Sequence, residues 1–404
     1  MRKQTLWLKG KWQSLRMVFA GVTLATTVLC ASSPNHEWIG QTAEASQVKP
    51  AAAKAVEPVT GRPVTGNPIT AAYVYDGKGT TYPQSTAAYL DQLNFSFALI
   101  KNGKVTGSHW QSIGAFKKFI AANPHITPVM AVGGWGADGF SQAASTDEGR
   151  KLFTQSALAL MEEHGFLGID IDWEYPGVSA AGIKSSSWDK TNFTLLLCEL
   201  REGIDKLTVK DGKKRLLCAA VGADKSLVKK IDCVSVGKLV DQLNLMTYDM
   251  HQETIATHHA NMYSGSGKYP ASAETAVQDY VNAGIPRHKI MLGAAFYGRA
   301  FKTGSAANGG LYASSKEKVT KHYSYATIKS MLDKGTAKRY YDDKAQAPYI
   351  YDGQLFISYD DPTSIAHKGY YVRLKGLMGM MCWQYGDDAN GELLRAMKKS
   401  LTRQ

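Results

Sequence analysis

Residues 165–177 read Gly-Phe-Leu-Gly-Ile-Asp-Ile-Asp-Trp-Glu-Tyr-Pro-Gly. Side chains along a β-strand alternate between its two faces, so Asp170, Asp172 and Glu174 share one face of a strand here. Two isoleucines and a tryptophan occupy the opposite face, which is therefore apolar. A solvated strand on a surface sheet does not fit this pattern. The Pro-Gly pair that follows ends the strand and leaves Glu174 at its carboxyl end.

Seven more apolar runs of similar length lie on either side of this strand, with amphipathic helical patterns such as 148–164 and 190–209 between them. Strands that alternate with helices predict a parallel sheet. Eight is the number that closes an α/β fold into a (β/α)₈ TIM barrel. An open doubly wound sheet is the alternative, but no Gly-x-Gly-x-x-Gly follows the first strand. The predicted strands are residues 69–75, 95–100, 126–134, 168–173, 215–222, 242–248, 289–297 and 376–385.

The last two predicted strands are separated by far more chain than one helix and its loops require. Within that interval, residues 325–334 have a helical pattern, and the alternation in 349–358 predicts a β-hairpin. We therefore expect a small α+β insertion at residues 301–355. The barrel then comprises residues 70–300 and 356–404.

The amino-terminal segment accounts for much of the net charge of +12. Residues 1–16 contain five Lys or Arg and no acid, and an apolar run with a small-residue exit follows. This order is typical of a secretory signal, so residues 1–31 are predicted to be removed on export, to the periplasm or the cell exterior. Removing those five charges leaves +7. An uncleaved membrane anchor is one alternative, but the apolar run is short for it. A lipoprotein modified at Cys30 is another, but bulky Leu29 before the cysteine disfavours it.

Residues 32–69 are predicted to be a linker or amino-terminal extension, because prolines recur there and aromatics are scarce. A strand that crosses onto the main domain is the alternative. No run of eighteen apolar residues occurs, which excludes a multi-span membrane protein, and no stable membrane association is expected after signal cleavage. The lysine-rich patches lack interleaved aromatics, so we expect no nucleic-acid partner. Cys218 and Cys382 lie in apolar strand-like runs and are predicted to be buried thiols.

The three carboxyl groups of the fourth strand lie about 6–7 Å apart along it. Inside a low-dielectric barrel they cannot all ionise, so at least one apparent pKa is raised. Such a group can donate a proton near neutral pH. A metal site is the competing interpretation, but no suitably spaced histidine accompanies the carboxylates. We therefore expect neither metal nor cofactor.

The fourth strand also resembles the D-G-x-D-x-D-x-E signature of the family 18 glycoside hydrolases, the chitinases. Five further segments resemble motifs of that family, in the family's order, within residues 71–397. They are Ala131-Val-Gly-Gly-Trp135, Asn244-Leu-Met-Thr-Tyr-Asp-Met250, Leu292-Gly-Ala-Ala-Phe-Tyr-Gly-Arg299, Tyr359-Asp-Asp-Pro-Thr-Ser364 and Gly376-Leu-Met-Gly-Met-Met-Cys-Trp383.

The resemblance implies catalytic roles for four residues. Glu174 would protonate the glycosidic oxygen, and Asp172 would bind the N–H of the substrate's 2-acetamido group. Asp170 would share a proton with Asp172, and Tyr248 would bind the acetamido oxygen. Substrate-binding roles are implied for Trp383 and Trp135 as stacking platforms, and for Asp249, Met246, Tyr297, Arg299 and Tyr73, with Tyr73 placed against Asp170.

The function implied is that of a chitinase that hydrolyses β-1,4-linked N-acetylglucosamine polymers with net retention, using the substrate's acetamido oxygen as nucleophile. The expected partners are chitin and chito-oligosaccharides, and we expect a monomer. In relatives the insertion accompanies action near chain ends. An endo-β-N-acetylglucosaminidase acting on peptidoglycan or N-glycans and a non-catalytic chitin-binding lectin are the alternatives.

Two positions depart from the family pattern. Leu167 stands where the family has the leading Asp, and because it lies off the carboxylate face we expect only a packing change. Ala131 stands where the family has a Ser beside the deepest carboxylate, so Asp170 is expected to depend more on Tyr73. The segment after Asp249 also lacks an aromatic that many relatives carry.

Overall fold

The computed structural model describes residues 67–402, apart from the side chains of residues 316 and 318. The predicted signal (residues 1–31) and most of the predicted linker (residues 32–69) lie outside this range. No helix in residues 67–402 has both the length and the apolar character needed to cross a membrane.

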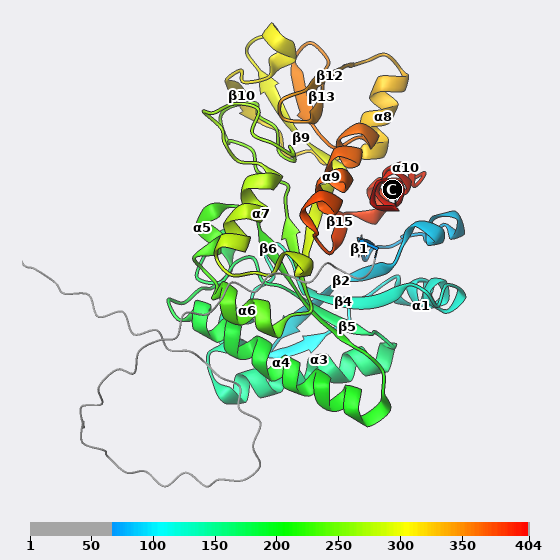
Figure 1. The fold of residues 1–404 in the computed structure, drawn as a ribbon, viewed down its shortest axis with the longest axis vertical. Coiled ribbons are helices and arrows are strands. Elements are labelled where there is room, and N and C mark those ends of the chain that lie inside the picture. Colours follow the sequence, from blue (N-terminus) through cyan, green and yellow to red (C-terminus); the bar gives the residue numbers. More distant parts are fainter. Residues whose placement is uncertain (1–66, 403–404) are drawn as a thin grey trace, which may run out of the picture. The chain divides into compact units, whose positions relative to one another are not determined.

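Eight parallel strands close into a barrel, because the first strand pairs with both the second and the last (Figure 1). The predicted fold class, a (β/α)₈ barrel with a small α+β insertion, is confirmed. A short strand, β3 (Lys104–Thr106), extends β2 in antiparallel fashion. The barrel strands are β1 (Ile69–Tyr75), β2 (Gln92–Lys101), β4 (Thr127–Gly133), β5 (Gly168–Asp172), β6 (Leu216–Gly222), β7 (Gln242–Met246), β8 (Ile290–Ala295) and β15 (Gly379–Trp383).

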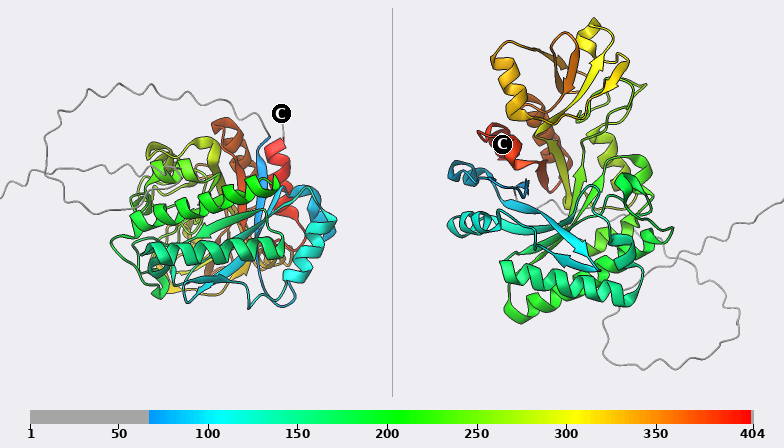
Figure 2. Two further views of the ribbon diagram at one scale, coloured as in Figure 1. Left: turned by 90° about the horizontal axis from the view of Figure 1, so that it is seen from below. Right: turned by 180° about the vertical axis from the view of Figure 1, so that it is seen from behind.

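Helices surround the barrel, and α3 and α4 lie side by side along it (Figure 2). Local signals set the ends of α3: the side chain of Thr146 accepts a hydrogen bond from Gly149 N–H, and Gly165 ends the helix at φ 74°. The helices around the barrel are α1 (Ile113–Ala122), α2 (Phe140–Ala144), α3 (Asp147–His164), α4 (Asp189–Asp211), α5 (Lys225–Val228), α6 (Cys233–Leu239), α7 (Ala273–Asn282), α9 (Pro362–Lys375) and α10 (Glu392–Thr402).

Two clusters make up most of the hydrophobic core of the barrel. The larger cluster fills the space between the strands and the surrounding helices. The smaller cluster fills the barrel interior and ends against the candidate site. It consists of Ala71, Tyr73, Ala131, Ala220, Met246, Met291 and Met381. Cys218 and Cys382 are buried free thiols, as predicted.

The insertion forms a second, antiparallel sheet with strand order β10-β9-β14-β13-β12, whose strands run from residue 297 to residue 358, a few residues beyond the predicted 301–355 at each end. It contains the predicted hairpin, β13 and β14, and the predicted helix α8 (Tyr325–Asp333). Figure 1 shows these elements grouped at one end of the described fold. The strands are β9 (Tyr297–Thr303), β10 (Ser315–Lys318), β11 (Tyr323–Ser324), β12 (Lys338–Asp342), β13 (Ala347–Tyr351) and β14 (Leu355–Ser358).

The predicted seventh strand, 289–297, is too long at its carboxyl end. The barrel strand β8 stops at Ala295, and Tyr297 opens β9 of the second sheet. Between them, the backbone N–H of Phe296 donates to the carbonyl of Trp383 at 2.8 Å. The sequence stays apolar from Ile290 to Tyr297, so hydrophobicity alone gives no indication of the break.

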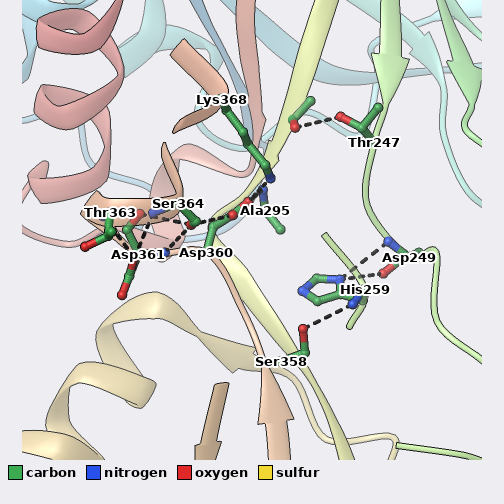
Figure 3. Close-up of polar contacts among 11 residues, drawn as sticks. Thr247, Asp249, His259, Ala295, Ser358, Asp360, Asp361, Thr363, Ser364 and Lys368 are labelled. Atoms are coloured by element: carbon green, nitrogen blue, oxygen red, sulfur yellow. Dashed lines mark hydrogen bonds and ion pairs between the residues drawn. The ribbon is translucent and has the colours of Figure 1, made fainter. Parts of the chain in front are cut away.

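A buried ion pair stabilises the junction between the insertion and the barrel (Figure 3). The side chain of Asp360 lies against Lys368 of α9, and both are almost completely inaccessible to solvent. Asp360 also accepts hydrogen bonds from the Ala295 backbone at 3.0 Å and from Ser364 at 2.7 Å. The end of β8 and the start of α9 are therefore held by one carboxylate.

Candidate active site

The deepest carboxylate of the fourth barrel strand is Asp170, which is fully buried in the barrel. It accepts a hydrogen bond from the Tyr73 hydroxyl at 2.6 Å and another from the Asn244 side-chain amide at 2.9 Å. Burial raises the pKa of Asp170 to about 6, although these two hydrogen bonds oppose the rise. Tyr73 thus lies against Asp170, where the resemblance places it.

Asp172 and Glu174 continue the same face toward the open end of the barrel. Asp172 is buried, and its Oδ1 has no hydrogen-bond partner within residues 67–402. Its pKa is raised by burial and by the negative charges of Glu174 and Asp170. Burial also raises the pKa of Glu174 to about 7; a hydrogen bond with Tyr175 opposes the rise and the charge of Asp249 adds to it. Glu174 can therefore carry a proton near neutral pH, as a general acid must.

The glycine pair at the end of β4, Gly133 and Gly134, lets that strand approach β5 closely. Gly134 N–H donates to the carbonyl of Asp172 at 2.9 Å. Gly133 has φ 117°, and a Cβ there would lie 2.1 Å from the same carbonyl oxygen. The pair turns the chain into Trp135, which is 65% exposed and meets Tyr175 edge-on. An exposed indole beside the candidate acid can stack on a sugar ring.

Asp249 lies beyond the end of β7 in the left-handed region, at φ 58°. Arg299 binds its carboxylate through two nitrogens, each at 2.6 Å, and the Tyr297 hydroxyl donates to it at 2.8 Å. Partial burial alone would raise the pKa of Asp249, but the hydrogen bonds and charge of Arg299, with a smaller contribution from His259, hold it well below its ordinary value. Asp249 therefore keeps a negative charge near Glu174, and the polar groups of Tyr297 and Arg299 point to Asp249.

Trp383, the last residue of β15, lies within an aromatic cluster. The Phe97 ring stacks on the indole with ring centroids 5.5 Å apart and an interplanar angle of 21°. The ring centroids of Tyr73 and Tyr75 lie 6.1 and 6.3 Å from that of Trp383. Since Phe97 covers one side of the indole, a sugar can stack only on the other. Tyr248 is half-buried, and its hydroxyl reaches the sulfur of Met381 at 3.9 Å.

Three residues at this site were missed by the sequence interpretation: Asn244, Phe97 and His259. Asn244 could have been found, because strand alternation places it on the same face of β7 as the predicted Met246. Phe97 lacks such a signal, because it contacts Trp383 from a distant part of the chain. His259 follows Asp249 by only ten residues, but it lies in a loop, where no strand or helix periodicity indicates its contact.

The two departures from the family pattern differ in consequence. Ala131 lies beside Asp170 in the register of β4 and β5. Its methyl group offers no hydrogen bond, so Asp170 is bound by Tyr73 and Asn244. Leu167 precedes the first residue of β5 and lies off the Asp170–Glu174 face, in agreement with a packing role.

The family model for glycosyl hydrolases family 18 matches residues 70–388, and the chain belongs to that family. Chitinase A1 of Niallia circulans is 32% identical over 335 residues, which are 75% of this chain and 47% of that protein. Endochitinase 1 of Metarhizium robertsii is 34% identical over 67% of this chain and 63% of its own length. The chain thus spans about half of the first relative and less than two thirds of the second.

Among solved structures, a family 18 N-acetylglucosaminidase from Paenibacillus barengoltzii matches with a TM-score of 0.79 and 37% identity. The match covers 83% of this chain and 100% of that one. The resemblance stated from the sequence motifs is confirmed.

Replacing Tyr73 with Phe is expected to shift the acid limb of the pH–rate profile to higher pH by about 1 unit. The Tyr73 hydroxyl stabilises the ionised form of Asp170, so its loss raises the Asp170 pKa above about 6. The measurement is kcat/KM on an N-acetylglucosamine oligomer between pH 3 and 9. Tyr349→Phe is the control, because that buried hydroxyl donates to the Asn308 carbonyl in the insertion. An unchanged acid limb in the Tyr73 variant would contradict the expectation.

Proposed function

We propose that the protein is a chitinase that hydrolyses β-1,4-linked N-acetylglucosamine polymers by substrate-assisted catalysis with retention. The observation that carries the proposal is the raised pKa of Glu174, about 7, on a face that it shares with two further buried carboxyl groups. The names of the relatives support the same substrate class.

In the first step, Glu174 gives its proton to the glycosidic oxygen as the bond from that oxygen to the anomeric carbon breaks. The acetamido oxygen of the same sugar attacks that carbon and forms an oxazolinium-like intermediate. Asp172 accepts the acetamido N–H and thereby orients the group, and Tyr248 donates to its oxygen. Asp170, bonded to Tyr73 and Asn244, shares a proton with Asp172 as charge develops.

In the second step, the ionised Glu174 takes a proton from water. That water attacks the anomeric carbon from the face that the leaving group vacated, so the configuration is retained. Trp383 and Trp135 stack on sugars on either side of the bond that is cleaved. Arg299 fixes Asp249, and the negative charge of Asp249 helps to raise the pKa of Glu174, so that Glu174 carries its proton before the first step.

The test compares chitin oligomers of equal length with and without N-acetyl groups. We expect rapid cleavage of the acetylated oligomer and no cleavage of the fully deacetylated one, because the latter lacks the nucleophile. The anomeric configuration of the first product, followed by NMR, should be that of the substrate. Comparable rates on both oligomers would contradict the mechanism.

An exo-acting N-acetylglucosaminidase is the second candidate, favoured by the match to the Paenibacillus barengoltzii enzyme of that name. The products from a labelled hexamer separate the two. A chitinase releases di- and trisaccharides first, whereas an N-acetylglucosaminidase releases only the monosaccharide at early times.

A further inference from the structure

The candidate site contains a buried histidine to which the mechanism gives no task. His259 is completely inaccessible to solvent and lies in the loop between β7 and α7. Its Nδ1 lies 3.4 Å from the backbone nitrogen of Asp249 and 3.5 Å from the Oδ1 of the same residue (Figure 3). Its Nε2 has no hydrogen-bond partner within residues 67–402. All polar contact of this ring is therefore made by one nitrogen, with one residue.

The ring itself is held rigidly. The His259 backbone N–H donates to the Ser358 hydroxyl at 3.1 Å, and its carbonyl accepts from Met250 N–H at 3.0 Å. The imidazole packs against the Tyr297 ring with centroids 5.2 Å apart. Burial lowers the pKa of His259, although the contact with Asp249 opposes this, so the ring is neutral near pH 7.

Asp249 needs a rigid neighbour. At φ 58° Asp249 lies in the left-handed region, which Asp tolerates better than most residues but which still favours glycine. Arg299 and Tyr297 hold the carboxylate of Asp249, but neither contacts its backbone N–H. With the proton on Nε2, His259 Nδ1 accepts that N–H; with the proton on Nδ1, it donates to the carboxylate. In both tautomers the contact passes through Nδ1.

We propose that His259 is a positioning residue that holds Asp249 in its left-handed conformation through Nδ1, and thereby fixes the charge that faces Glu174 and the bound sugar. This inference rests on the proposed function for the role of Asp249 toward substrate. The geometry of Asp249 itself can be tested without substrate.

Two variants of similar polarity separate the two ring nitrogens. In His259→Asn the side-chain amide lies near the position of Nδ1, whereas in His259→Gln it lies near that of Nε2. We expect the Asn variant to stay within about threefold of wild type in kcat and KM. We expect the Gln variant to raise KM for an N-acetylglucosamine tetramer about tenfold, the size of one lost hydrogen bond to a charged group. Its alkaline pH limb should also move to lower pH, because a displaced Asp249 raises the Glu174 pKa less.

His258→Gln is the matched control. His258 is the adjacent residue, is also buried, and its Nε2 lies within hydrogen-bond distance of Asp342 Oδ2 in the insertion, at 3.2 Å. Loss of the contact between His258 and Asp342 can lower the Tm, but we expect no change in the pH profile or in KM. If the control and His259→Gln change the pH profile and KM alike, or if His259→Asn and His259→Gln lose equal activity, the inference is wrong.

Crystal structures of both His259 variants supply the readout that needs no substrate. We expect the Arg299–Asp249 pair and the left-handed φ of Asp249 to persist in the Asn variant and to be lost in the Gln variant. An unmoved Asp249 in the Gln variant would overturn the inference even if the enzyme is active. A wild-type protein without activity on the tetramer would contradict the proposed function alone.

Discussion

Replacing Glu174 with Gln is expected to lower kcat on chitin oligomers by about 10²–10⁴-fold, the usual contribution of a positioned general acid. Gln has nearly the shape of Glu but cannot donate the proton that the leaving oxygen requires. The variant should also lose the alkaline limb that the Glu174 pKa of about 7 gives the wild type. Initial rates on a labelled hexamer between pH 4 and 9 measure both effects.

Folding and binding should survive the change. Glu174 has a raised pKa, so its ionised form is disfavoured in the folded state, and a neutral amide removes repulsion from Asp172 and Asp249. We expect an unchanged or slightly higher Tm and retained oligomer binding. Glu202→Gln, at an exposed position in α4, is the control for the loss of one carboxylate. If the Glu174 variant kept more than about a tenth of the activity, Glu174 would not be the acid. A wild type that binds the hexamer without cleaving it would favour the lectin alternative.

Replacing Asp360 with Ala is expected to lower the free energy of unfolding by about 3–5 kcal/mol. The change leaves the Lys368 ammonium buried without its partner and removes the acceptor for Ala295 N–H. Urea unfolding at pH 7 measures the loss. The loss of unfolding free energy should become smaller between pH 7 and 10. Burial lowers the pKa of Lys368, so without its partner Lys368 is neutral in the folded state at a pH where it is still charged in the unfolded state, and raising the pH removes this difference.

A double variant tests the cause of this loss. Asp360→Leu combined with Lys368→Met removes both charges and keeps apolar volume, so we expect it to recover much of the stability lost by Asp360→Ala. Asp343→Ala, at an exposed position in the insertion, should change stability by less than about 0.5 kcal/mol. If the double variant were less stable than the single one, the uncompensated Lys368 charge would not explain the loss.

Local patterns predict most of the barrel. Each barrel strand is a short run with apolar residues on at least one face, and β1 begins and ends where the sequence places it, at Ile69 and Tyr75. The alternation of Asp170, Asp172 and Glu174 also predicts a carboxylate face, because the alternation of side chains along a strand depends only on residues close together in the chain. Burial is the largest cause of the raised pKa at each of the three, and the charges of the other two carboxylates add to it at Asp172.

The remainder depends on contacts between distant segments. The end of β8 at Ala295 is set by pairing with β15 and by the antiparallel partners of β9, none of which is visible in the run itself. The resemblance places Arg299 against bound sugar, and this role stays a prediction. The structure adds a pairing of Arg299 with Asp249, fifty residues earlier. Nothing in either local sequence indicates that pairing.

The strand β9 has a consequence for protein engineering. It is the first strand of the insertion, yet its residues Tyr297 and Arg299 supply the hydrogen bonds to Asp249 at the mouth of the barrel. The insertion is therefore not a detachable module. A chimera that exchanges this region between relatives needs its first junction after Arg299; a junction at the end of β8 would exchange part of the active site together with the insertion.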